Sequence, residues 1–261
     1  MTDSNPQYLQ VGEGTGRRRI AVLRDAGAEP ELIWLPGFKS DMVSTKASAL
    51  GAWARKKGLA CTRFDYSGHG QSQGRFEDGT IGRWLEETRE IFSRVTRGQV
   101  IVIGSSMGGY LALLLLRQLL AEDPKEASRI KALVLIAPAW DMTETLMWDK
   151  FPEDVRQTIQ ETGVWLRPSI YGEPYPITRD LIEDGRQHLF GQTTWDPGRP
   201  VCILQGLQDP DVPWEHVFEL EKKLTGGWVE LTSVPDGEHR LSRPEDIDLL
   251  FRLIEENAFE A

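Results

Sequence analysis

Short apolar runs rich in β-branched residues alternate along the chain with longer segments that mix apolar and charged positions. Short continuous apolar runs are typical of strands buried on both faces, and the longer mixed segments are typical of helices. We expect strands at 8–11, 18–24, 32–35, 59–64, 100–103, 132–137, 201–204 and 228–231, and helices at 44–57, 80–96, 110–116, 214–224 and 244–255. This alternation predicts a single α/β domain over residues 1–261, with a mainly parallel sheet that opens on an antiparallel pair of strands.

One long region, 138–200, departs from this alternation. It is rich in prolines and aromatic residues, with helical patterns near 153–162 and 178–185, and we expect no strand in it before residue 201. We interpret it as a lid inserted between two strands, because aromatic richness favours a lid over a helical layer that only decorates the fold. The residues expected to shape an acyl pocket are Trp140, Met142, Trp148 and Trp165.

Composition narrows the class of protein. The net charge of −10 argues against a nucleic-acid-binding surface and against attraction to anionic membranes. No apolar run is long enough to cross a bilayer, and the first residues lack the basic and apolar regions of a signal peptide, so we expect a cytoplasmic protein with no membrane insertion. Cys61 and Cys202 lie in or beside apolar runs, and we expect two buried free thiols.

The strongest chemical motif follows the strand expected at 100–103. It is the G-x-S-x-G sequence Gly104-Ser105-Ser106-Met107-Gly108, which continues into an apolar helix. A serine at the tip of such a strand–turn–helix unit needs small neighbours two residues away on both sides, which the glycines provide. The pattern predicts that Ser106 is a catalytic nucleophile in a nucleophile elbow.

A nucleophilic serine needs an imidazole as its base and an acid that orients the imidazole. In folds with this elbow the acid follows a late strand and the histidine follows the last one. Asp209 and Asp211 both follow the strand at 201–204; we expect Asp209 to be the acid and Asp211 to cap the next helix. His239 follows the last strand and is the predicted base.

The three remaining histidines are expected to lie outside the triad. We expect a structural role for His69, a surface or packing role for His216, and a possible substrate contact for His188 in the lid. The backbone N–H groups of Met107 and Phe38 are the expected oxyanion donors. No metal or cofactor is predicted, because the sequence lacks the His, Cys or carboxylate spacings of common ligand sets.

With these residues placed, the chain resembles the α/β-hydrolase superfamily along essentially its whole length. The sequence Asp65-Tyr-Ser-Gly-His-Gly-Gln-Ser72 is similar to a structural turn of that superfamily, although Leu35-Pro36-Gly37 stands where many members carry His-Gly. The segments 35–42, 75–78 and 167–178 are similar to the branch called abhydrolase-domain-containing protein ten. The resemblance implies palmitoyl-protein thioesterase or acyl-glucuronide esterase activity, with Ser106, Asp209 and His239 as triad and Phe38 and Met107 as oxyanion donors.

The leading hypothesis is therefore a serine esterase or thioesterase that acts on a small-molecule or acylated-protein substrate. A small serine peptidase of the same fold and a non-catalytic binding module are the alternatives, and the sequence does not indicate an oligomeric state. Arg179 in the lid has two interpretations. It is either a surface cation paired within the lid or a group that binds an anionic substrate such as a glucuronide carboxylate.

Overall fold

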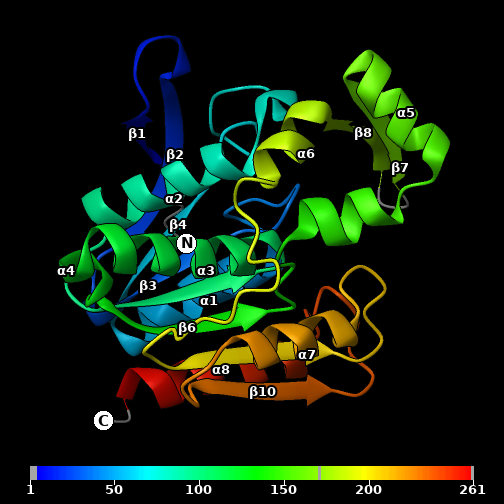
Figure 1. Cartoon of the computed structure of the whole chain (residues 1–261). Helices are drawn as coiled ribbons and strands as arrows, with labels where there is room; N and C mark the ends of the chain where they lie inside the picture. The colour runs from blue at the N-terminus through cyan, green and yellow to red at the C-terminus, as the bar shows by residue number, and fades with distance from the viewer. Residues whose placement is uncertain (1–4, 170–171, 260–261) are drawn as a thin grey trace.

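The protein is built on an eight-stranded sheet with the order β1-β2-β4-β3-β5-β6-β9-β10 (Figure 1). The computed structural model describes residues 5–169 and 172–259. Within this sheet, over the residues described, only the β1–β2 and β2–β4 pairs are antiparallel, so the predicted mainly parallel sheet is confirmed. The strands are β1 Gln7–Val11, β2 Arg18–Asp25, β3 Ala28–Leu35, β4 Leu59–Phe64, β5 Val100–Ser105, β6 Ile130–Ile136, β9 Val201–Gly206 and β10 Val229–Val234.

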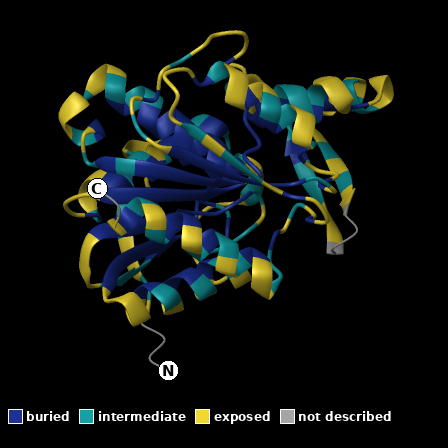
Figure 2. Ribbon diagram, turned by 90° about the horizontal axis from the view of Figure 1, so that it is seen from below, coloured by how far each residue is buried: buried dark blue, intermediate teal, exposed yellow. Residues whose placement is uncertain are grey.

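Helices cover both faces of the sheet and enclose two apolar cores, visible as buried strands between partly exposed helices (Figure 2). One core packs under α1 (Thr45–Lys57) and α8 (Pro244–Phe259). The other packs under α2 (Ile81–Arg94), α3 (Met107–Glu122) and α7 (Trp214–Lys223). Helix α3 is buried over most of its length, as its apolar composition predicts. The short helices are η1 Gly14–Gly16, η2 Phe76–Asp78 and α4 Pro124–Ala127.

The region between β6 and β9 forms a separate layer above the carboxyl ends of the strands (Figure 1). It contains η3 Thr143–Met147, η4 Trp148–Lys150, α5 Glu153–Thr162, β7 Val164–Ser169, β8 Gly172–Thr178 and α6 Arg179–Gly185. The helices α5 and α6 agree with the helical patterns predicted near 153–162 and 178–185. The expectation of no strand before residue 201 is wrong. β7 and β8 form a two-stranded antiparallel ribbon whose open edges tolerate Pro174 and Pro176, residues that made the segment resemble a loop.

Two further predictions can be compared with the structure. Cys61 and Cys202 are both buried free thiols, as expected, and burial raises the pKa of the Cys61 thiol to about 12. In the part of the chain that the structure describes, no helix has the length and apolar character to cross a membrane. Residues 170–171, which belong to the segment 167–178 that contributes to the family resemblance, lie outside the described residues.

Candidate active site

Ser106 lies at a sharp turn between β5 and α3. Its backbone has φ 55° and ψ −116°, a conformation that costs free energy for a residue with a side chain and is characteristic of functional sites. The flanking glycines permit it: a Cβ on Gly104 would lie 2.3 Å from the Gly108 carbonyl oxygen, and one on Gly108 would lie 2.0 Å from that of Leu35. The two glycines therefore allow a sharp turn that leaves Ser106 partly exposed at the end of a central strand.

The loop after β3, residues 36–39, lies directly against this turn. A Cβ on Gly37 would lie 3.4 Å from the Cβ of Ser106. Among the described residues, the backbone N–H groups of Phe38 and Met107 have no hydrogen-bond acceptor. Two free N–H donors on the two segments that meet at a serine are what an oxyanion site requires.

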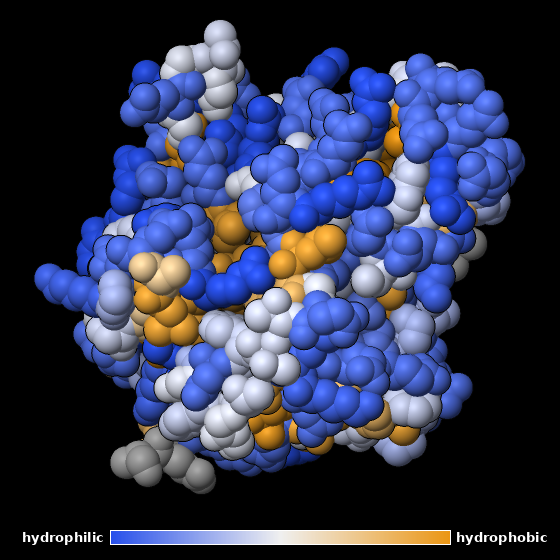
Figure 3. Space-filling view, viewed as in Figure 1, coloured by the Kyte–Doolittle hydropathy of each residue, from blue (hydrophilic) through white to orange (hydrophobic). Residues whose placement is uncertain are grey.

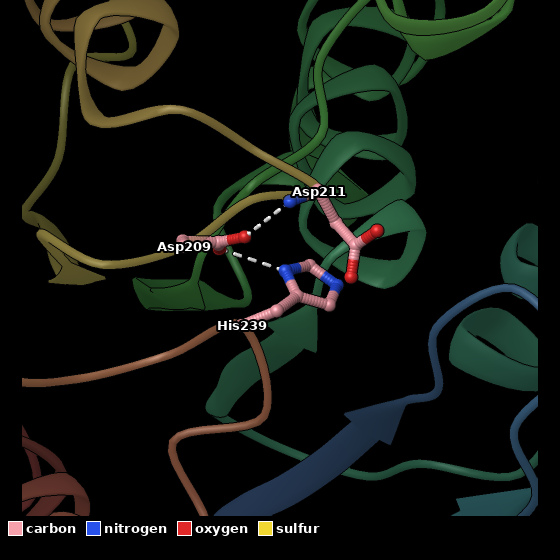
Figure 4. Close-up of side chains that lie close together, drawn as sticks. All are labelled: Asp209, Asp211 and His239. Carbon is pink, nitrogen blue, oxygen red and sulfur yellow. Dashed lines mark hydrogen bonds and ion pairs between the residues drawn. The ribbon is translucent and has the colours of Figure 1, made fainter. Parts of the chain in front are cut away.

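Asp209 and His239 are in direct contact (Figure 4). Nδ1 of His239 lies 2.7 Å from Oδ2 of Asp209, whose other oxygen accepts from the N–H groups of Asp211 and Val212 at 2.8 Å each. The Asp209 carboxylate is fully buried, whereas the imidazole is partly exposed. Three N–H donors on one buried carboxylate fix its orientation, and that carboxylate in turn fixes the imidazole.

The two loops that carry these residues are held together by their backbones. Gln208 N–H donates to the Gly237 carbonyl at 2.9 Å, and a Cβ on Gly206 would lie 2.4 Å from the same oxygen. Because β3, β5, β6, β9 and β10 are parallel neighbours, the loops after them emerge at one edge of the sheet. The structure thus brings Phe38, Ser106, Asp209 and His239 to the same edge.

Asp211 does not cap the following helix, so that prediction is wrong. Helix α7 begins at Trp214, with Pro213 at its N-cap and no side-chain capping bond. The exposed Asp211 carboxylate instead points toward the His239 ring (Figure 4), and donor atoms of Asp209, Asp211 and His239 lie within 4.8 Å of one another. The sequence spacing did not indicate this group. Since both Asp209 oxygens already accept N–H donors, the arrangement is typical of a carboxylate that orients an imidazole.

Two other histidines are held in place by hydrogen bonds with backbone groups. His69 lies between the Ser67 carbonyl and the Lys39 N–H, each at 3.1 Å, and burial lowers its pKa to about 4. His216 stacks on Trp140 and exchanges hydrogen bonds with it: a ring nitrogen of each lies 2.8 Å from the other residue's carbonyl oxygen. Burial also lowers the pKa of His216 to about 4. Both geometries agree with the structural roles predicted for them.

His188 lies elsewhere, between α2 and α6. Its Nε2 is 3.7 Å from Asp184, and its carbonyl accepts from Tyr110 at 3.0 Å. It lines a second cleft, of about 400 Å³, together with Gly82, Leu85, Glu86, Arg89, Glu90 and Gln118. None of these residues belongs to the loops that follow β3, β5, β9 and β10, so the structure does not bring His188 to Ser106.

The residues predicted to shape an acyl pocket are distributed through the root and body of the lid. Trp140 and Met142 are buried, and Ala139, just before them, donates its N–H to the Ser106 carbonyl at 3.1 Å. Trp148 lies under the guanidinium of Arg186 at 4.9 Å, and Trp165 packs edge-on against Phe151. Trp140 and Met142 thus follow closely in the chain on a residue bonded to the elbow, whereas Trp148 and Trp165 pack against other residues of the region 138–200.

Arg179 is engaged within the lid. Its Nη1 donates to the Gln160 carbonyl at 3.1 Å, near the end of α5, and its Nε lies 4.0 Å from Glu183. These contacts join α5 to α6 and favour the interpretation of Arg179 as a lid cation over that of a substrate ligand.

A cleft of about 460 Å³ that the sequence did not indicate lies between the lid ribbon and the loops that follow β3 and β4. Tyr175 from β8 forms one wall, with its ring 6.0 Å from that of Phe38 and 4.0 Å below the Lys39 ammonium. The pKa of the Tyr175 hydroxyl is raised, mainly by burial. The Asp211 carboxylate adds to this increase, and the Arg167 guanidinium opposes it. Other lining residues are Ser40, Asp41, Gly68, His69, Gly70, Phe76, Glu173, Pro174 and Pro176. Figure 3 shows apolar surface exposed near the centre of a mostly hydrophilic face.

Comparisons with known proteins agree with this architecture. Residues 32–247 match the model of the alpha/beta hydrolase family. The human palmitoyl-protein thioesterase ABHD10, mitochondrial, is 31% identical over 91% of this chain and 76% of its own length. The crystal structure of a putative hydrolase from Agrobacterium vitis is 42% identical with a TM-score of 0.93, over 97% of this chain and 98% of its own. Alpha/beta hydrolase domain-containing protein 10 from mouse is 29% identical with a TM-score of 0.83, over 97% and 98%.

Proposed function

The chain belongs to the alpha/beta hydrolase family, and from this membership we propose that it is a serine hydrolase of carboxylic esters and thioesters. The observation that carries the proposal is the 2.7 Å contact between His239 and the buried Asp209, at the sheet edge where Ser106 occupies a strained turn. An imidazole oriented by a carboxylate, on the same sheet edge as a serine in a strained turn, suits acyl transfer.

In the proposed mechanism, Ser106 Oγ attacks the acyl carbonyl carbon while Nε2 of His239 takes its proton. Asp209 holds the Nδ1–H tautomer of the ring and stabilises the imidazolium that forms. The oxygen of the tetrahedral intermediate accepts from the N–H groups of Phe38 and Met107. The C–O or C–S bond then breaks, and the imidazolium gives its proton to the departing alcohol or thiol. Water activated by the same imidazole hydrolyses the acyl-enzyme.

The proposed substrate is an acyl ester or acyl thioester of a small molecule or of a protein. Support comes from the relatives named as palmitoyl-protein thioesterases and from the cleft beside the Phe38 loop, whose walls combine aromatic rings with the Lys39 ammonium. The proposed acyl pocket uses Trp140 and Met142, two buried residues that come shortly after Ala139, whose N–H donates to the Ser106 carbonyl. We also propose a cytoplasmic location for this chain. The mammalian relatives are named as mitochondrial, so cell fractionation is needed to test this proposal.

A chain-length series tests the proposal. Nitrophenyl esters and thiocholine esters from acetyl to decanoyl are compared for the wild type and for Ser106→Ala. The account predicts Ser106-dependent turnover whose kcat/KM changes by a few-fold to about 15-fold for each pair of methylenes, the upper limit following from about 0.8 kcal/mol for each fully buried CH₂. A flat profile contradicts an apolar acyl pocket, and turnover that survives in Ser106→Ala contradicts the serine mechanism.

A further inference from the structure

The loop that carries His239 runs from the end of β10 to the start of α8, and a different neighbour holds it on each side of the histidine. On the side before His239, the Gly237 carbonyl accepts from the N–H of Gln208, on the loop after β9. On the side after it, the Arg240 carbonyl accepts from the ammonium of Lys46, in the first turn of α1. A side chain from α1 therefore bonds to the backbone next to the proposed base.

His239 lies in a tight turn that ends at a strained residue. The N–H of Leu241 donates to the Glu238 carbonyl at 3.2 Å, which closes a four-residue turn with His239 at its second position. Leu241 has φ 40°, which costs free energy for a residue with a side chain. Its side chain is buried in the core under α1 and α8, and a Cβ on Gly237 would lie 2.6 Å from its Cδ2. A strained torsion thus joins the turn to a fixed side chain.

The bond to Lys46 opposes relaxation of that torsion. The peptide between Arg240 and Leu241 uses its N–H to close the turn and its carbonyl to bind Lys46. Rotation about the N–Cα bond of Leu241 toward negative φ would swing His239 and Arg240 relative to the buried side chain, because all residues before that bond move together. The carbonyl would then leave the ammonium, and the imidazole would leave the carboxylate that orients it.

Ser242 completes a small network around this carbonyl. Its hydroxyl donates to the Arg240 carbonyl at 2.8 Å and accepts from the Lys46 ammonium at 3.4 Å. Ser242 belongs to the same loop as the turn, whereas Lys46 belongs to a helix that packs on the core. Of these two donors, Lys46 is therefore the one that ties the turn to another element of the fold.

The Lys46 ammonium loses its proton at a lower pH than an exposed lysine does. Burial lowers the pKa of Lys46 to about 8, and the Arg240 guanidinium adds to this effect. The Asp246 carboxylate in α8 acts in the opposite direction, although it also binds the guanidinium of Arg243. On α1 itself the next charged residue is Arg55, more than two turns further along the helix. Lys46 is therefore mostly charged at pH 7 and mostly neutral well above pH 8.

We propose that Lys46 is a positioning residue of the active site, whose ammonium holds the turn 238–241 in the conformation that keeps the His239 imidazole where the reaction requires it. The inference rests on the proposed function, because it concerns the base of that reaction. Lys46 is not among the described residues that line the cleft beside the lid ribbon. A loss of positioning should therefore lower kcat and leave KM nearly unchanged.

A matched pair of lysines on one helix tests the proposal. Lys46→Met keeps an aliphatic side chain and removes the donor, so kcat on nitrophenyl butyrate at pH 7 should fall about tenfold or more, the scale of one charge-assisted hydrogen bond, with KM within about twofold. Lys57 binds Glu255 of α8 from a position roughly 16 Å further along α1. Lys57→Met also removes a lysine bond made by this helix, but it should leave kcat within about twofold, as is usual for a surface ion pair.

The pH dependence separates positioning from a purely structural role. Both forms share the titration of the other groups, so the ratio of wild-type kcat to that of Lys46→Met isolates the effect of the ammonium. This ratio should fall at least about threefold between about pH 7 and 9.5, since a neutral amine is a weaker donor than an ammonium. Rates are measured well below the thermal midpoint of each form, with the rate of Ser106→Ala subtracted as background.

The outcomes distinguish the inference from the function on which it rests. Equal kcat in Lys46→Met and Lys57→Met, or a ratio that stays constant with pH, overturns the role of the Lys46 ammonium while Ser106-dependent turnover leaves the proposed function standing. Wild-type turnover that does not depend on Ser106 overturns the proposed function and the inference together.

Discussion

The sheet edge that carries the proposed triad and the lid above it are built on different principles. At the edge, Ser106, Asp209 and His239 follow parallel strands of one sheet, so backbone topology alone brings their loops together. In the lid, Arg179, Trp165 and their neighbours are placed by side-chain contacts with other parts of the lid. The residues of the proposed triad thus depend on a few defined orientations, whereas the lid shares its interactions among many residues.

The largest expected effect on activity is a difference in kcat between variants of two carboxylates that lie two residues apart. Asp209→Asn should lower kcat by about 10³- to 10⁴-fold, because the amide no longer holds His239 in the required tautomer. Asp211→Asn should change kcat by no more than a few-fold, since the Asp211 N–H, not its carboxylate, supports Asp209. Ester turnover with circular dichroism as a folding control measures both.

The reverse order of the two variants would assign the acid to Asp211. Equal and small effects would mean that orientation of His239 does not limit turnover, and the difference between the edge and the lid would disappear.

The contrast also separates what the sequence could predict from what it could not. The alternating apolar runs and the G-x-S-x-G motif predicted the sheet and the tight turn at Ser106, because buried strands and tight turns leave strong local patterns. The ribbon β7–β8 was missed because prolines obscure strand patterns, and its contact with Phe38 through Tyr175 depends on packing between distant segments. The direction of Asp211 was missed because an aspartate before a helix has the same local pattern whether it caps or not.

A smaller effect is expected on the thermal stability of the protein at acidic pH, and it involves both regions. Burial lowers the pKa of both His69 at the edge and His216 under the lid to about 4. Below about pH 6.5 these histidines bind protons in the unfolded chain but stay neutral in the folded chain. The free energy of unfolding therefore decreases as the pH falls toward 4. The thermal midpoint should fall by several degrees over this range, at about 2–4 °C per kcal/mol.

The substitution His216→Phe measures how much of the acid-induced fall in the thermal midpoint comes from protonation of His216. The variant keeps a ring against Trp140 but has no group to protonate, so its midpoint should be lower at pH 7 and should fall less between pH 6.5 and 4.5. Scanning calorimetry at matched ionic strength measures this. An acid-induced fall as large as that of the wild type would show that His216 does not contribute.

The smallest effect is expected in the body of the lid. Arg179→Ala removes one bond to the Gln160 carbonyl and a long contact with Glu183, both partly exposed. KM for an acyl glucuronide and for the neutral nitrophenyl ester of the same acid should change equally, by about twofold or less, as is usual for surface ion pairs. A selective rise in KM for the glucuronide of about tenfold would instead make Arg179 an anion-binding residue and would weaken the contrast with the edge.

The measurement that tests the central claim most directly is the site of covalent modification by a fluorophosphonate. The account predicts a single adduct on the peptide that carries Ser106, found by mass spectrometry of a digest. The adduct should be absent in Ser106→Ala and should form at least about 10³-fold more slowly in His239→Ala, because the serine then lacks its base. An adduct that persists in Ser106→Ala, or labelling as fast in His239→Ala as in the wild type, would contradict the account.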